Sequence, residues 1–193
     1  MKYLLKTSVG GNGDIAGYPA FRSQRGVTLA EMLVAITIMG IILIIAAPNY
    51  RIFVMDNRQA TAINEFIGFL NFARSEATKR GSVVRICRSA DGLVCSGAGV
   101  QWEDGWMVYQ DTDDDDTRDA GEPILKVKAA LNDSLQMRGN GNAFSRVRFN
   151  ARGFAPGYAS SFTFCDVRGD SDVKSIAIAV TGRVARGAEV ACL

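Results

Sequence analysis

The sequence predicts an α+β protein in which one long N-terminal helix packs on an antiparallel β-sheet head. A continuous apolar run comes first, and a segment with helical apolar spacing follows it as far as Gly81. Short runs rich in β-branched and aromatic residues then alternate with glycines. The chain of 193 residues therefore favours one domain with appendages over two independent domains.

The apolar run from Val27 to Ala47 is long enough to cross a bilayer as a helix, and it carries one charge, Glu31. Arg22 and Arg25 precede it, and positive charge on that flank favours a cytoplasmic N-terminus. A secretory signal peptide fits poorly, because the run is too long and no small-x-small cleavage pattern follows it. A plain signal anchor is the stronger alternative, but it does not explain a carboxylate within the span.

The helical pattern continues beyond Pro48 with a single apolar face. The residues on this face are Ile63, Phe66, Ile67, Leu70 and Ala77. The polar residues off this face include Gln59, Asn64, Asn71, Arg74 and Lys79. Arg80 and Gly81 supply a basic last turn and a C-cap glycine. We therefore expect one helix over residues 27–80, apolar all round at first and amphipathic afterwards.

Six segments after Gly81 have the composition of strands. They cover residues 83–87, 106–110, 124–127, 146–149, 162–167 and 175–180. This part of the chain is large enough to bury a core, although a core of that size benefits from disulfides.

The four cysteines, Cys87, Cys95, Cys165 and Cys192, indicate disulfides and an oxidising compartment. They allow three pairings, and the sequence alone does not choose among them. Zinc binding is the weaker interpretation, because the chain has no Cys-x-x-Cys pair and no histidine. The lack of histidine also excludes Ser-His and Cys-His catalysis.

Charge is unevenly distributed, although the net charge is only +2. Residues 81–122 carry three arginines and ten acids, a local charge of −7. Residues 123–193 carry ten basic residues and five acids, a local charge of +5. The head is therefore expected to have an acidic first half and a basic second half.

The segment Arg25-Gly26-Val27-Thr28-Leu29-Ala30-Glu31 resembles the class III signal of type IV pilins and type II secretion pseudopilins. The resemblance implies that a prepilin peptidase cuts after Gly26 and that Val27 becomes N-methylated. Residue 27 is valine where the family more often has Phe or Met, which bears on the efficiency of processing.

The same resemblance gives assembly roles to Glu31, Gly40 and Pro48, which match the family's glutamate and its helix-breaking glycine and proline. It implies that the Glu31 carboxylate pairs with the Val27 ammonium of a neighbouring subunit. This directional pair would set the axial register of a filament. The alternative is a carboxylate that faces lipid headgroups.

The head resembles the GspH/FimT branch of minor pilins. The residues that carry this resemblance are Cys87–Gly92, Cys95, Trp102, Gly105–Trp106, Gly121–Leu125, Phe164–Asp166 and Thr181–Val184. The resemblance implies the type IV pilin fold, no enzymatic activity, and disulfides that pair Cys87 with Cys95 and Cys165 with Cys192. It covers nearly all of residues 22–193, with a generic stretch over residues 128–160.

The predicted organisation has four segments. They are a leader peptide (1–26), a transmembrane and assembly helix (27–48), the amphipathic half of the helix (49–80) and a disulfide-bonded head (81–193). We expect a single-pass protein of the bacterial inner membrane with a periplasmic head, later incorporated into a pilus or pseudopilus. The expected partners are other minor and major pilins, the prepilin peptidase and the inner membrane.

The acidic loop, residues 111–122, matches part of a calcium-loop template. Acids occupy positions 1, 3, 5, 9 and 12, namely Asp111, Asp113, Asp115, Asp119 and Glu122. Asp116 replaces the glycine of position six, and strand-like segments flank the loop instead of helices. We therefore favour a solvated hairpin loop and keep Ca²⁺, the one cofactor considered, as the alternative.

Basic residues of the second half could track the phosphates of DNA. They are Arg146, Arg148, Arg152, Arg168, Lys174, Arg183 and Arg186. Some FimT-like pilins are DNA receptors that use a Gly-Arg-x-Arg element, but here Arg186 comes one residue late after Arg183. On a strand these two arginines would face opposite ways. Solvated arginines, or contacts with the acidic face of a next subunit, are the favoured interpretation.

The predicted function is that of a minor pilin that primes or caps assembly of the type IV pilus. The alternatives are a DNA receptor for natural transformation and a minor pseudopilin of type II secretion.

Overall fold

The computed structural model describes residues 26–97, 99–131, 134–141, 145–169, 173–187 and 192. The elements are α1 (Leu29–Arg80), β1 (Val83–Arg88), the 3-10 turn η1 (Trp102–Asp104), β2 (Gly105–Asp111), β3 (Ile124–Ala129), β4 (Leu135–Gly139), β5 (Arg146–Phe149), β6 (Ser160–Asp166), β7 (Lys174–Ile178) and β8 (Val184–Arg186). The chain divides into two compact units between Ala46 and Ala47. The predicted leader, except Gly26, lies outside the described residues.

The part of α1 that belongs to the first unit is apolar and exposed. Leu33, Ile41 and Ile44 each have more than half of their surface exposed. By length and composition α1 can cross a membrane. Pro48 follows shortly after and lacks the N–H that would bind the carbonyl of residue 44. The helical hydrogen-bond ladder is therefore interrupted close to the boundary between the units.

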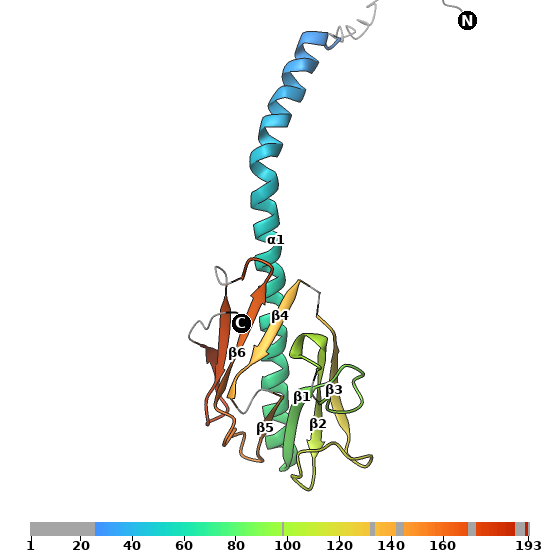
Figure 1. Ribbon diagram of the computed structural model, residues 1–193, viewed down its shortest axis with the longest axis vertical. Coiled ribbons are helices and arrows are strands. Elements are labelled where there is room, and N and C mark those ends of the chain that lie inside the picture. Colours follow the sequence, from blue (N-terminus) through green and yellow to red (C-terminus); the bar gives the residue numbers. More distant parts are fainter. Residues whose placement is uncertain are drawn as a thin grey trace, which may run out of the picture. The chain divides into compact units, whose positions relative to one another are not determined.

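The strands form two antiparallel sheets, with the orders β3-β2-β1-β5 and β4-β6-β7-β8. Figure 1 shows both sheets against the C-terminal half of α1. The predicted fold class is confirmed, and the strands divide between two sheets instead of one.

Two strands were not predicted, β4 and β8. In β4, Leu135 and Met137 are buried while Gln136 is exposed, so the strand does carry an alternating signal, although a short one. Only three residues form β8, fewer than a period of two can identify. Gln59 was expected among the polar residues off the apolar face of the helix, but it is fully buried. Its amide donates a hydrogen bond to the carbonyl of Phe164 in β6 at 3.0 Å, which compensates for its burial.

The core is organised around Phe66 on the apolar face of α1. Its ring centroid lies 5.1 Å from that of Trp106 in β2 and 4.7 Å from that of Phe162 in β6. Trp102 of η1 lies 5.5 Å from the same ring. All of these contacts are edge-to-face, the arrangement that aromatic rings favour. One fully buried side chain therefore contacts both sheets.

We expect Phe66→Ala to destabilise the head by about 3–5 kcal/mol, because it removes a ring that the sheets cannot replace by moving closer. The measurement is thermal unfolding of the detergent-solubilised full chain, followed by the fluorescence of Trp102 and Trp106. Phe53→Ala is the matched control, since Phe53 is 63% exposed on the same helix. Equal loss of stability in both variants would contradict the central role of Phe66.

Candidate functional site

The start of α1 lies directly after the predicted cleavage site. Gly26, Val27 and Thr28 are outside the helix. Oγ1 of Thr28 accepts a hydrogen bond from the Glu31 amide at 3.2 Å, and the Thr28 carbonyl accepts one from the Met32 amide at 3.2 Å. Thr28 is therefore the N-cap. The Thr-x-x-Glu spacing is a capping-box pattern, a sequence signal that places the helix start at residue 29 instead of the predicted 27.

Glu31 lies in the first turn of α1, where the helix dipole favours a carboxylate. Its side chain is exposed, and so is that of Val27. Packing within this chain does not require a glycine at position 40, because an added Cβ there would meet no atom within 4 Å. Glu31 and Val27 are thus accessible to a neighbouring chain, as the predicted ion pair requires.

Two disulfides close loops of the head. One joins Cys87 at the end of β1 to Cys95, and the other joins Cys165 in β6 to Cys192. This is the pairing that the family resemblance implies. The first disulfide fixes a short loop beside the first sheet, and the second attaches residue 192 to the second sheet.

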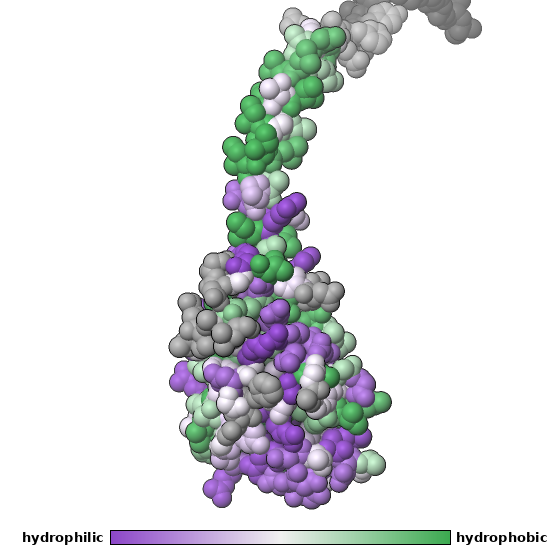
Figure 2. Space-filling model, in the orientation of Figure 1, coloured by the Kyte–Doolittle hydropathy of each residue, from purple (hydrophilic) through white to green (hydrophobic). Residues whose placement is uncertain are grey.

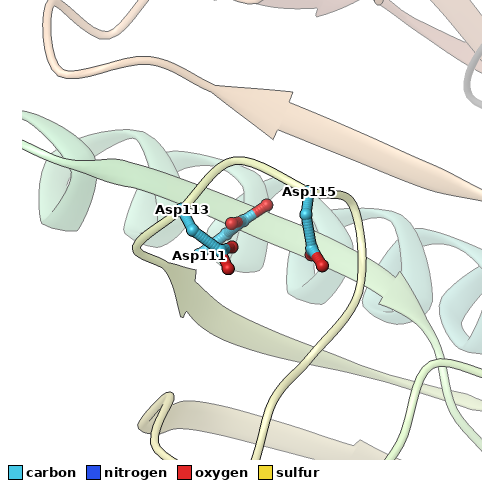
Figure 3. A group of neighbouring side chains, drawn as sticks. All are labelled: Asp111, Asp113 and Asp115. Carbon is cyan, nitrogen blue, oxygen red and sulfur yellow. The ribbon is translucent and has the colours of Figure 1, made fainter.

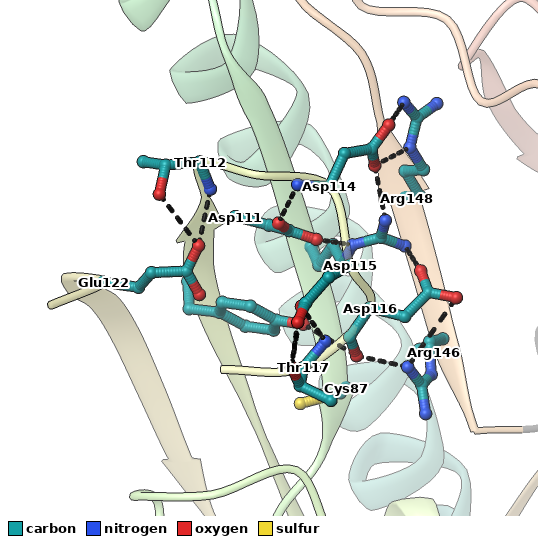
Figure 4. A network of polar contacts seen from close by, with 12 residues as sticks. Cys87, Asp111, Thr112, Asp114, Asp115, Asp116, Thr117, Glu122, Arg146 and Arg148 are labelled. Carbon is teal, nitrogen blue, oxygen red and sulfur yellow. Dashed lines mark hydrogen bonds and ion pairs between the residues drawn. The ribbon is translucent and has the colours of Figure 1, made fainter. Parts of the chain in front are cut away.

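The face of the first sheet that is turned away from the main core carries charged residues. Register places Arg85 of β1 directly opposite Arg148 of β5, and Cys87 opposite Arg146. Like charges at opposite positions destabilise a sheet. The acidic loop lies over this face and supplies carboxylates to it (Figure 4).

Arg85 is at the centre of this network and is almost fully buried. Its guanidinium forms ion pairs with Asp111 and, at 2.5 Å, with Asp114. Asp114 also accepts a hydrogen bond from Nε of Arg148 at 2.7 Å. The carboxylate of Asp114 therefore bridges the two opposed arginines and offsets their repulsion.

Asp116 bridges Arg85 and the other arginine of β5, Arg146. Its carboxylate pairs with Arg85, and its backbone carbonyl accepts a hydrogen bond from Arg146. Asp114 and Asp116 both have positive φ, 63° and 75°, a conformation that aspartate tolerates better than most residues. The loop thus adopts two unfavourable backbone conformations in order to turn these carboxylates toward the sheet.

The surroundings of Asp114 and Arg85 favour the charged form of each side chain. Hydrogen bonding from Arg148 holds the pKa of Asp114 below its ordinary value, and the charges of Arg148 and Arg85 lower it further. Burial opposes the charge on Arg85, but the hydrogen bond and the charge of Asp111 raise the pKa of Arg85 above its ordinary value. Asp114 and Arg85 are therefore each stabilised in the charged form by the other members of the network.

Three of the five predicted calcium ligands lie together. Carboxylate oxygens of Asp111, Asp113 and Asp115 are within 4.8 Å of one another (Figure 3). Both oxygens of Asp111 are engaged within the protein, Oδ2 by Arg85 and Oδ1 by the amide of Asp114 at 2.6 Å. Asp113 is exposed, but partial desolvation by its neighbours, followed by the charge of Asp115, raises its pKa. Repulsion among these acids is therefore only partly offset.

The other two predicted ligands close the base of the loop. Glu122 is buried and accepts hydrogen bonds from the backbone amides of Thr112 at 2.5 Å and Asp119 at 3.1 Å. These bonds are an internal role for a carboxylate that the calcium template assigns to the metal. Arg85 supplies positive charge inside the loop, so calcium binding there stays a prediction.

The predicted basic residues are divided between two environments. Arg146 and Arg148 bind the acidic loop, and Arg168 pairs with Asp56 of α1 at 2.9 Å. Arg183 precedes β8 and Arg186 ends it, and both are exposed. Neither forms an ion pair within the described part of the chain. Arg146 and Arg148 therefore do not join Arg183 and Arg186 in one uncompensated basic surface, because the acidic loop neutralises them.

Arg74 of α1 holds two turns side by side. It donates hydrogen bonds to the carbonyls of Gly153 at 3.0 Å and Thr181 at 3.1 Å. Gly182 has a φ of +75°, and a Cβ there would lie 2.1 Å from the Gly153 carbonyl oxygen. This close approach requires glycine. Arg152, which precedes Gly153, is brought near Arg183, the residue after Gly182.

A groove of about 370 Å³ lies between α1 and the connection from β3 to β4. Ala62, Leu131 and Leu135 are among its lining residues. At its rim, Lys128 forms an ion pair with Glu65 at 2.8 Å.

The apolar helix, the antiparallel sheets and the motif at Gly26 define a type IV pilin-like protein. The N-terminal methylation motif of prokaryotes matches residues 21–47, and the family described as type II transport protein GspH matches residues 62–182. The chain belongs to the GspH family. It is thus a membrane-anchored pilin, a structural protein without enzymatic activity, in a family that interacts with other pilins and with the prepilin peptidase.

Two crystal structures are similar to the head in fold. Both are of the type IV minor pilin FimU of Pseudomonas aeruginosa, in space groups P21 and P65. The first is 20% identical, with a TM-score of 0.55, and covers 70% of this chain and 92% of its own. The second is 19% identical, with a TM-score of 0.52, and covers 67% and 92%. No curated protein matches the chain significantly. The predicted resemblance to GspH/FimT minor pilins is confirmed.

We expect Arg85→Met to destabilise the head by about 3–5 kcal/mol, because Asp111 is left buried without a counter-charge. Adding Asp111→Asn to this variant should recover part of the loss, since the unpaired charge is then removed. Thermal unfolding of the solubilised full chain measures both effects. If the single variant is as stable as the unmodified chain, the network does not stabilise the loop.

Proposed function

We propose that the protein is a minor pilin that primes or caps assembly of the type IV pilus at the inner membrane. The observation that carries the proposal is the matched methylation motif, whose cleavage bond lies outside α1 while Glu31 is exposed in its first turn. Cleavage after Gly26 would free the amine of Val27. The apolar helix would hold the subunit in the membrane, single-pass, with its head in the periplasm.

In this mechanism the Glu31 carboxylate meets the Val27 ammonium of a neighbouring subunit in a medium of low dielectric constant. An unpaired charge there is expensive, so the pair forms in one register only. The compact, disulfide-bonded head then presents the surfaces that contact other minor and major pilins. A minor pseudopilin of type II secretion would use the same chemistry. The description of the matched family names type II transport, whereas the similar solved structures are of a type IV minor pilin.

Deletion of the gene should strongly reduce the pili that can be sheared from cells, and the native chain should restore them. We expect Glu31→Gln to be cleaved normally, as seen by mass spectrometry of the N-terminus, but to restore few pili. Glutamine at this position still supports the helix cap, so the loss reports the charge alone. Met32→Leu is the control variant and should restore pili fully. Normal piliation in the deletion strain would refute the priming role and leave protein secretion as the function to test.

A DNA receptor for natural transformation is the second candidate. The observation in its favour is that Arg183 and Arg186 are exposed and form no ion pair among the described residues, with Arg152 nearby. Phosphate contacts of this kind need unpaired basic side chains.

If DNA binds at these arginines, changing Arg183 and Arg186 together to alanine should lower the slope of log K against log salt by about 2 for duplex DNA. The affinity of the solubilised full chain is measured at several salt concentrations. The double variant Arg51→Ala and Arg58→Ala is the control, because it removes equal charge from α1. The same slope in both double variants would exclude Arg183 and Arg186 as a DNA site.

A further inference from the structure

The stretch of α1 that follows the apolar run has exposed aromatic and basic side chains. Tyr50 and Phe53 are 67% and 63% exposed, and Arg51 between them in the chain is exposed as well. Figure 2 shows hydrophilic and hydrophobic side chains mixed here, after a part of the helix that is almost wholly hydrophobic. Side chains that combine an apolar body with a polar or charged end favour the headgroup layer of a membrane.

The place of Arg51 in the sequence matches that layer. The apolar run from Val27 to Ala47 has the length of the hydrocarbon core of a bilayer, about 30 Å as a helix. Arg51 follows Ala47 by about 6 Å of helix. The headgroup layer on each side of the core is about 5–7 Å thick. The guanidinium of Arg51 is therefore expected at the depth of the lipid phosphates.

Arg58 adds a second positive charge on the same face of the helix. A hollow of about 220 Å³ is lined by Tyr50, Arg51, Val54, Met55 and Arg58. Arg58 lies roughly 10 Å further along the helix than Arg51. That separation is close to one Debye length at physiological salt. Arg58 can thus attract an anion bound at Arg51 without touching it.

The described part of the protein does not neutralise these two arginines. Neither Arg51 nor Arg58 forms an ion pair within the ranges that the structure describes. The one acid of residues 48–58 is Asp56. Its carboxylate already pairs with Arg168 at 2.9 Å and with Lys174 at 3.9 Å. The stretch therefore presents an uncompensated positive charge.

Positive charge at this end of the span opposes the expected orientation in the membrane. Lysine and arginine near a span favour the cytoplasmic side, and Arg22 and Arg25 mark the N-terminal flank in that way. Arg51 and Arg58 lie within 15 residues of the other end, so they weaken the same signal. Exposed charge with this cost and with no ion pair in the described chain suits a ligand of opposite charge outside the protein.

From these observations we propose that Arg51 binds the phosphate of an anionic phospholipid in the leaflet next to residue 48. Tyr50 and Phe53 pack beside the lipid at the interface, and Arg58 strengthens the attraction. In the topology proposed above this is the periplasmic leaflet. A bilayer fits better than nucleic acid, because exposed aromatic side chains flank the arginine directly after a span. The interaction does not depend on the role in priming pili.

Photo-crosslinking of the full chain in vesicles tests the proposal. The vesicles consist of phosphatidylcholine and phosphatidylglycerol, with a trace of phosphatidylglycerol that carries a photoreactive headgroup. We expect a lipid crosslink that mass spectrometry maps to residues 50–58. In matched vesicles the photoreactive headgroup is on phosphatidylcholine instead, and the yield at these residues should be about tenfold lower. No pilus forms in this experiment, so its failure is distinct from failure of the proposed function.

Substitutions provide the second arm. Arg51→Gln with Arg58→Gln should lower the phosphatidylglycerol crosslink at residues 50–58 about tenfold. Arg51→Gln alone should lower it more than Arg58→Gln alone, because only Arg51 contacts the phosphate. Arg152→Gln with Arg183→Gln is the control, since it removes the same charge from exposed turns of the head and should leave the yield unchanged. Thermal unfolding checks that all variants remain folded.

Four outcomes would overturn the proposal. They are equal crosslinking to both lipids, an unchanged yield in the double variant of Arg51 and Arg58, an equal loss in the control variant, and a crosslink that maps only outside residues 50–58. The first would show that the headgroup charge is not recognised. The third would show that only the total charge of the chain matters.

Discussion

The ring of Phe66 fixes where both sheets meet α1. Because it contacts Trp106 in one sheet and Phe162 in the other, neither sheet can slide along the helix without opening a gap between aromatic rings. Glu103 of η1 adds a second link, since its carboxylate binds both the amide of Met137 and the side chain of Arg138 in β4. The positions of the acidic loop and of the turns beside Arg74 depend on this arrangement.

The first sheet has a second face to cover, and charge covers it. Arg85 and Arg148 stand opposite each other on neighbouring strands, so the sheet would be strained without the carboxylates of the acidic loop. The loop that looks like a metal site in the sequence is therefore largely a counter-charge for arginines that lie far away in the chain. Because the loop neutralises Arg146 and Arg148, fewer uncompensated basic residues remain on the surface to bind a partner. Those that remain lie chiefly at the turns beside Arg74.

Periodicity in the sequence was sufficient to predict α1 and six strands, because both signals are local. Burial of Gln59 could not be predicted, since its partner Phe164 lies more than a hundred residues later in the chain. The division of strands between two sheets likewise depends on long-range pairing. The same limit applies to the candidate site, where the residue types were visible in the sequence but the pairing of Arg85 with the acidic loop was not.

The N-cap at Thr28 has a consequence for the proposed cleavage after Gly26. It keeps the bond between Gly26 and Val27 outside the helix, where a protease can bind the backbone in an extended form. After the cut, a new ammonium would lie beside the positive end of the helix dipole, which disfavours it. Glu31 lies in the first turn of the helix, and its carboxylate would offset both the ammonium and the positive end of the helix dipole. A lone subunit would thus balance its own terminus in the bilayer, and polymerisation would exchange that internal partner for a neighbour's.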